Sequence, residues 1–200
     1  MSEPLKIYVI RHGETAWSLT GQHTGLADIP LTPNGEAMAR KLATSLQGIA
    51  FAKILTSPRL RARRTCELAG FGAKAETEAL LAEWDYGQYE GLRSAEIRQL
   101  HPGWDIWTSP CPGGETAEHI SGRADKLIAS LRDITGNVIL FSHGHFGRVL
   151  AARWIGLPVT QGQHFALDPA SISVLGFEAS HPERRVISRW NAESSVAISS

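Results

Sequence analysis

The sequence has little of several features that define whole classes of protein. Its two cysteines, Cys66 and Cys111, are too few for a disulfide framework. No apolar run approaches the roughly 20 residues of a membrane-spanning helix, and we recognise no signal peptide before Lys6. The 20 basic and 20 acidic side chains give a formal net charge of zero, which argues against binding to nucleic acid or membranes through bulk charge. We therefore expect a cytoplasmic protein with neither a nucleic-acid nor a membrane partner.

Motifs for metals and nucleotides are also missing. The eight histidines include no His-Glu-x-x-His pattern, and His143 and His145 are too close in sequence to form a good ligand pair without other anchors. The glycines at 70 and 72 lack the Lys-Ser/Thr that completes a phosphate loop. We expect no metal and no cofactor, and the sequence leaves the oligomeric state open.

What the chain does contain is a regular alternation of apolar runs and helical patterns. Buried strands are expected at residues 7–10, 52–56 and 138–141, and later strands at 171–177 and 185–190, joined by a turn at 179–183. Helices are expected from Pro33 toward Gly48, with Thr32 as the N-cap and Pro33 at the first helical position, and at 60–68 and 94–100. Two more are expected along the apolar row from Ile120 to Leu131 and after His143. This order predicts an α/β fold of three layers, α/β/α, with a mostly parallel sheet and an antiparallel edge strand.

The length of 200 residues suits one domain spanning residues 1–200. Residues 83–116 are rich in Trp, Gly and Pro, and we interpret them as a loop-rich cap segment over the active site. The small, polar tail at 192–200 is expected to fray.

The most informative motif is Arg11-His12-Gly13-Glu14-Thr15, which directly follows the first apolar run. Ligands of open α/β sheets bind at the carboxyl ends of the strands, so both Arg11 and His12 are expected there. A guanidinium offers a fork of donors to phosphate oxygens, and a neutral imidazole can attack phosphorus. Three further segments stand at strand ends or in polar loops: Ser57-Pro58-Arg59-Leu60-Arg61-Ala62, the carboxylate-bearing loop Glu83 to Gly91, and Ser142-His143-Gly144-His145.

These four segments, in this order, resemble the histidine phosphatase superfamily of phosphoglycerate-mutase-like enzymes. Further stretches look like its sedoheptulose-1,7-bisphosphatase-type branch: Trp17-Ser18, Gly21-Gln22-His23-Thr24-Gly25, Arg63 after the second segment, and Glu83-Trp84-Asp85-Tyr86-Gly87. The resemblance implies a phosphatase that works without a metal, through phosphohistidine. It also implies the same three-layer architecture.

The chemistry and the resemblance assign the same roles. His12 is expected to attack phosphorus, with its other ring nitrogen donating to a backbone carbonyl or a loop carboxylate. Arg11, Arg61, a protonated His143 and the backbone of Gly144 are expected to bind the phosphoryl oxygens. Glu83 would give a proton to the leaving oxygen, with Trp84 and Tyr86 shielding it from water.

For several of these residues an alternative interpretation is open, in which the residue has no part in the reaction or another residue takes its role. Arg59, Arg61, Arg63 and Arg64 could form a solvated helix face, although helical spacing turns Arg61 away from Arg59 and Arg63. Glu90 or Glu115 could do the work of Glu83, with Glu115 the first reserve. His145 is expected beside the site rather than in the reaction. No catalytic role is expected for the other histidines: His23, His101, His119, His164 and His181.

The loop after His12 carries small polar groups suited to sugar hydroxyls or a second phosphate. The predicted substrate-binding residues are Ser18, Gln22, Thr24, Gly25 and Tyr86. Mutases of the superfamily usually have Asn where this chain has Ser18, and Gly113-Gly114-Glu115-Thr116 resembles the phosphatases, or forms a plain turn capped by Thr116. We therefore predict a phosphatase acting on small phosphorylated metabolites, with sugar phosphates or bisphosphates favoured. The alternatives are a phosphoglycerate mutase and an inactive module that binds phosphorylated ligands.

Overall fold

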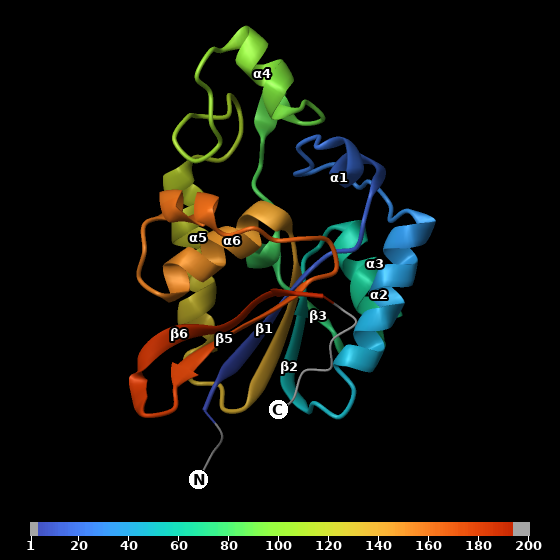
Figure 1. The fold of residues 1–200 in the computed structure, drawn as a ribbon, viewed down its shortest axis with the longest axis vertical. Coiled ribbons are helices and arrows are strands. Elements are labelled where there is room, and N and C mark those ends of the chain that lie inside the picture. The colour runs from blue at the N-terminus through green and yellow to red at the C-terminus, as the bar shows by residue number, and fades with distance from the viewer. Residues whose placement is uncertain (1–3, 194–200) are drawn as a thin grey trace.

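A six-stranded sheet forms the centre of the computed structural model, which describes residues 4–193 (Figure 1). The strands are β1 (Lys6–Arg11), β2 (Phe51–Thr56), β3 (Glu76–Thr77), β4 (Asn137–Ser142), β5 (Ile172–Glu178) and β6 (His181–Ala192). Their order is β3-β2-β4-β1-β5-β6, with the first four strands parallel and β5 and β6 antiparallel. The predicted mostly parallel sheet with an antiparallel edge is confirmed.

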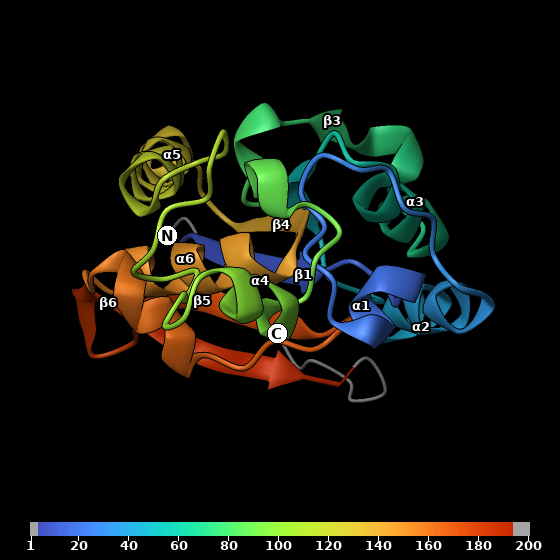
Figure 2. The ribbon, with the colours of Figure 1, turned by 90° about the horizontal axis from the view of Figure 1, so that it is seen from above.

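Helices cover both faces of this sheet, as Figure 2 shows from above. They are α1 (Ala16–Thr20), α2 (Pro33–Ser45), α3 (Leu60–Leu68), α4 (Ser94–Leu100), α5 (Ala117–Leu131) and α6 (Gly144–Trp154). Alternate strand residues face opposite layers. Tyr8 and Ile10 of β1 pack in the cluster that contains Leu42 of α2 and Cys66 of α3, whereas Val9 packs in the cluster formed with α5 and α6. The three-layer architecture is therefore confirmed.

Local signals explain where the longer helices begin. The Thr32 side chain accepts a hydrogen bond from the Gly35 amide, and Pro33 occupies the first helical position, as predicted for α2. Thr116 likewise caps α5 by accepting from the His119 amide. The predicted apolar row of α5 is buried throughout, from Ile120 to Leu131.

Some boundaries differ from the predictions. Ser18 lies in α1 rather than in a loop, because Thr15 and Ser18 each bond the backbone amide of the other and so start a short helix. Strand β6 begins at His181, so the turn before it is shorter than predicted. Strand β6 extends to Ala192, the first residue of the predicted tail, while residues 194–200 lie outside the described residues.

The register of the central strands positions the candidate site. Arg11 pairs with Ser142 across β1 and β4, and Thr56 pairs with Phe141 across β2 and β4. The residues that follow these strands therefore emerge at one edge of the sheet: His12, His143 and Ser57. Helices α1 and α4 lie beyond this edge (Figure 1). Within residues 4–193, no helix combines the length and the apolar character needed to cross a bilayer.

Candidate active site

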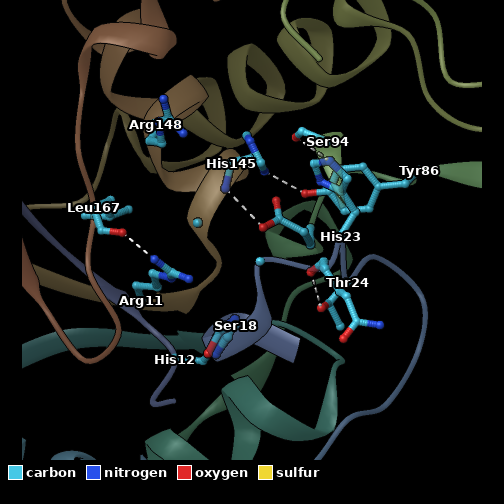
Figure 3. Close-up of a pocket in the computed structure, with 14 residues that line it drawn as sticks. Arg11, His12, Ser18, His23, Thr24, Tyr86, Ser94, His145, Arg148 and Leu167 are labelled. Atoms are coloured by element: carbon cyan, nitrogen blue, oxygen red, sulfur yellow. Dashed lines mark hydrogen bonds between the residues drawn. The ribbon is translucent and has the colours of Figure 1, made fainter. Parts of the chain in front are cut away.

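A cavity of about 250 Å³ lies at this edge (Figure 3). Eight of the predicted site residues line it: Arg11, His12, Ser18, Gln22, Thr24, Glu83, Tyr86 and Gly144. Arg61 and His143 do not line it but lie next to His12. Gly25 does not line it either, and its amide donates to the Glu90 carboxylate. The structure thus gathers residues from four distant segments around one pocket.

His12 is held in an orientation suited to nucleophilic attack. Its Nδ1 lies 2.7 Å from the carbonyl oxygen of Gly13, which can only accept, so Nδ1 carries the hydrogen. Nε2 then carries the lone pair, and it accepts a hydrogen bond of 3.3 Å from Arg61 Nε. Burial, followed by the charges of Arg61 and Arg11, lowers the pKa of His12 well below its ordinary value. The ring is therefore neutral at neutral pH. Of the two partners predicted for its second nitrogen, the structure has the backbone carbonyl.

Arg61 is fully buried at the start of α3, whereas Arg63 is exposed, as helical spacing predicted. Besides its contact with His12, its guanidinium donates to the carbonyls of Thr24 (2.7 Å), Gly25 (3.2 Å) and Ala27 (2.9 Å). Burial lowers the pKa of Arg61, although a guanidinium keeps its charge in proteins. Arg61 therefore fixes the loop after α1 and places a positive charge beside the lone pair of His12.

His143 directly precedes α6 and lies beside His12, with ring centroids 5.3 Å apart. Its Nε2 is 2.7 Å from Ser57 Oγ, and its Nδ1 is buried without a hydrogen-bond partner among the described residues. Burial and the neighbouring Arg61 lower the pKa of His143 well below its ordinary value. These effects favour a neutral ring, so protonation of His143 stays a prediction that depends on the bound phosphate. A bound phosphate would raise this pKa.

Arg11 ends β1, and the carbonyl of the neighbouring Leu167 accepts a hydrogen bond from its Nη1 (Figure 3). Its Nε is buried without a partner among the described residues. Gly144, in the first turn of α6, lies so close to Arg11 that an added Cβ would be 3.4 Å from that Nε. A helix N-terminus beside a guanidinium is an environment that favours an anion.

Glu83 lines the same cavity and is 7% exposed. Its Oε1 accepts from the amides of Trp84 (2.9 Å) and Phe146 (2.8 Å), and its Oε2 accepts from the amide of His145 (3.0 Å). Backbone amides, two of them at the start of α6, thus orient the carboxyl toward the pocket. The sequence suggested aromatic shielding by Trp84 and Tyr86 but not this amide cradle.

The two alternative carboxylates are occupied elsewhere. Glu115 forms a bidentate ion pair with Arg123, at 2.8 Å and 3.0 Å, and does not line the cavity. Glu90 accepts hydrogen bonds from the amides of Gly25, Leu26 and Ala27. Neither geometry supports the replacement of Glu83.

The wall opposite Arg11 consists of hydroxyl and imidazole groups, several of which the sequence did not indicate. His23 is 7% exposed and contacts Ser94 Oγ through Nε2 at 3.1 Å, and His145 Nδ1 lies 2.7 Å from the Tyr86 hydroxyl. Burial lowers the pKa of His23 to about 4. Burial and Arg148 lower the pKa of His145 well below its ordinary value. Both rings are therefore neutral at neutral pH.

Arg148 also lines the pocket, stacked 4.7 Å from the ring centre of Trp107. A helix that starts after His143 would place residues 145 and 148 on one side, so His145 and Arg148 could have been found from their spacing. No comparable pattern marks His23 or Ser94, which the fold alone brings together. Across residues 4–193, no group of three or more His, Cys, Asp or Glu side chains is arranged to hold a metal ion.

Comparisons with known proteins agree with this geometry. Residues 7–193 match the family model described as "Histidine phosphatase superfamily (branch 1)". An acid phosphatase of Mycobacterium tuberculosis is 43% identical over 178 residues, covering 86% of this chain and 87% of the relative. Sedoheptulose 1,7-bisphosphatase of Saccharomyces cerevisiae is 36% identical over 183 residues, covering 76% and 68%.

A solved protein structure from Mycobacterium tuberculosis superposes with a TM-score of 0.88 at 38% identity, covering 94% of this chain and 98% of that one. A probable phosphoglycerate mutase of Salmonella choleraesuis is more distant, at 27% identity over 205 residues, with 98% and 94% coverage.

Proposed function

The chain belongs to the histidine phosphatase superfamily and is a phosphatase of that superfamily; from this premise we propose that its pocket hydrolyses phosphate monoesters of small metabolites through phosphohistidine at His12. The observation that carries the proposal is the tautomer of His12. With Nδ1–H on the Gly13 carbonyl, Nε2 presents its lone pair beside Arg61 and His143.

The reaction has two steps. His12 Nε2 attacks phosphorus, the ester P–O bond breaks, and Glu83 gives a proton to the departing oxygen. Water then attacks the phosphorus of phosphohistidine, Glu83 takes a proton from that water, and the P–N bond to Nε2 breaks, which releases inorganic phosphate and regenerates His12. Arg11, Arg61, His143 and the amide of Gly144 stabilise charge on the phosphoryl oxygens. No step needs a metal.

Sugar phosphates or bisphosphates are the proposed substrate class. The wall offers hydroxyl and imidazole groups for hydrogen bonds to a polyol, from Ser18, Thr24, Ser94 and His145. Among the described residues, neither Arg11 nor Arg148 has a carboxylate ion-pair partner, which favours a strongly anionic substrate. One relative is named as a sugar bisphosphatase. We also propose the cytoplasm as its compartment, which cell fractionation would test.

The test is a screen of phosphorylated metabolites for phosphate release in the presence of a chelator. The His12→Ala variant should lose turnover of every substrate and keep its fold, whereas His181→Ala, which changes an exposed histidine on β6, should match wild type. Turnover that survives His12→Ala, or that needs added metal, would refute the proposal. Isomerisation of phosphoglycerate that requires a bisphosphate primer would instead favour a mutase, and binding without phosphate release would favour an inactive module.

A further inference from the structure

Arg123 of α5 holds the backbone that carries Glu83. Its Nη1 donates to the carbonyls of Leu80 (2.8 Å) and Ala82 (2.6 Å), and its Nη2 donates to the carbonyl of Glu83 (3.2 Å). One guanidinium therefore binds three carbonyls in a stretch of four residues. This stretch leads from the short 3₁₀ turn Ala79–Leu81 directly into the proposed acid.

Arg123 is itself tightly fixed. Glu115 accepts from its Nε at 3.0 Å and from its Nη2 at 2.8 Å, and its guanidinium lies 4.6 Å from the ring centre of Phe146. The two charged side chains are only 16% and 15% exposed. A largely buried, bidentate pair of this kind has a defined geometry, unlike most surface ion pairs.

Glu83 is thus held at two points by two different helices. Its main chain is bound by Arg123 from α5, and its carboxylate is bound by amides at the start of α6. Proton transfer requires the carboxyl to lie within hydrogen-bonding reach of the leaving oxygen, so a small shift of the backbone at residues 80–83 would weaken it.

We propose that Arg123 and Glu115 form a positioning pair for proton donation by Glu83. The inference rests on the proposed function and assigns Glu115 a role in support of Glu83 rather than in its place. Neither residue touches the substrate. The pair acts by keeping the Glu83 carboxyl at the proton-transfer distance from the ester oxygen.

This role makes a prediction that a general loss of stability does not make. A leaving group of low pKa departs without a proton, whereas an alkoxide of high pKa depends on the acid. The Arg123→Met variant should therefore lose less than about 5-fold in kcat/KM for p-nitrophenyl phosphate. It should lose about 100-fold for an alkyl phosphate, since general acids contribute roughly 10²- to 10⁴-fold.

The experiment measures kcat/KM over a series of aryl and alkyl phosphates and plots its logarithm against the leaving-group pKa. We expect a steeper slope for Arg123→Met and, to a smaller extent, for Glu115→Gln, which keeps an oxygen acceptor for Arg123. The matched control is Arg153→Met. Arg153 forms a similar bidentate pair with Asp125 between α6 and α5, but within residues 4–193 it makes no hydrogen bond to residues 80–83. Its plot should stay parallel to that of wild type.

The Glu83→Gln variant separates the two levels of inference. If Glu83→Gln does not steepen the plot, the proposed role of Glu83 fails and the positioning role fails with it. If Glu83→Gln steepens the plot while Arg123→Met and Glu115→Gln lower all substrates by one factor, the positioning role is overturned and the phosphatase mechanism stands. Should Arg123→Met fail to fold, the slope for Glu115→Gln decides the matter alone.

Discussion

His23 is expected to make the fold sensitive to acid. Its ring packs against Tyr86, with centroids 4.6 Å apart, and against Trp104 at 5.5 Å, while Nε2 contacts Ser94 Oγ. Burial, with a smaller effect of Arg98, lowers the pKa of His23 to about 4. In the unfolded chain this pKa returns to about 6.5.

The sign and size of the effect follow from these two values. Below about pH 6.5 His23 is protonated in the unfolded chain but stays neutral in the folded chain until about pH 4. The free energy of unfolding therefore falls as the pH falls. The difference of about 2.5 pKa units corresponds to about 3 kcal/mol below pH 4, of which about 2 kcal/mol is already lost at pH 5.

Urea denaturation at about pH 7.5 and about pH 5 measures this loss. His23→Gln keeps a polar partner for Ser94 but does not titrate, so its free energy of unfolding should fall by about 2 kcal/mol less than that of wild type over this interval. His119→Gln, which changes an exposed histidine on α5, should behave as wild type. Equal losses for wild type and His23→Gln would refute the assignment of a buried neutral ring.

Two further perturbations test other parts of the site. Gly87 has φ +53°, and a Cβ there would lie 2.3 Å from the Pro112 carbonyl oxygen, whereas Gly113 has φ +73° and open space. In chemical denaturation Gly87→Ala should therefore lower the free energy of unfolding by about 2 kcal/mol more than Gly113→Ala. Equal losses for the two variants would contradict the close approach at Gly87. Ser57→Ala removes the partner of His143 Nε2 and should lower kcat/KM about 10-fold, so unchanged kinetics would show that Ser57 does not orient His143.

Much of the fold was predictable because its signals are local. Apolar runs marked β1, β2 and β4, and the Thr32-Pro33 start marked α2 with its N-cap. Strand β3 could not be predicted, since Glu76 and Thr77 are exposed and pair only because β2 lies beside them. Helix α1 depends on a reciprocal Thr15–Ser18 cap that contains none of the usual acidic signal.

The candidate site likewise contains residues that local motifs predict and residues whose roles depend on tertiary packing. His12, Arg61 and His143 follow strands or begin helices, so their motifs predict that they meet. The role of Glu115 could not be predicted from the sequence, because its partner Arg123 lies eight residues away. Whether Glu115 forms an ion pair or serves as the proton donor depends on tertiary packing. The lowered pKa of His143 could not be predicted for a similar reason, since burial is a property of the folded chain.

Because Arg11 pairs with Ser142, the residues that follow them, His12 and His143, are held together by the central sheet. Both histidines at the reaction centre are attached to adjacent strands in the middle of the sheet, so separating them requires rupture of the whole core. Residues 83–116 and the loop after β1 are not attached in this way. Amide hydrogen exchange should therefore be slowest in the central strands that carry His12 and His143. Substitutions in the surrounding loops can change which substrates bind without moving these two histidines.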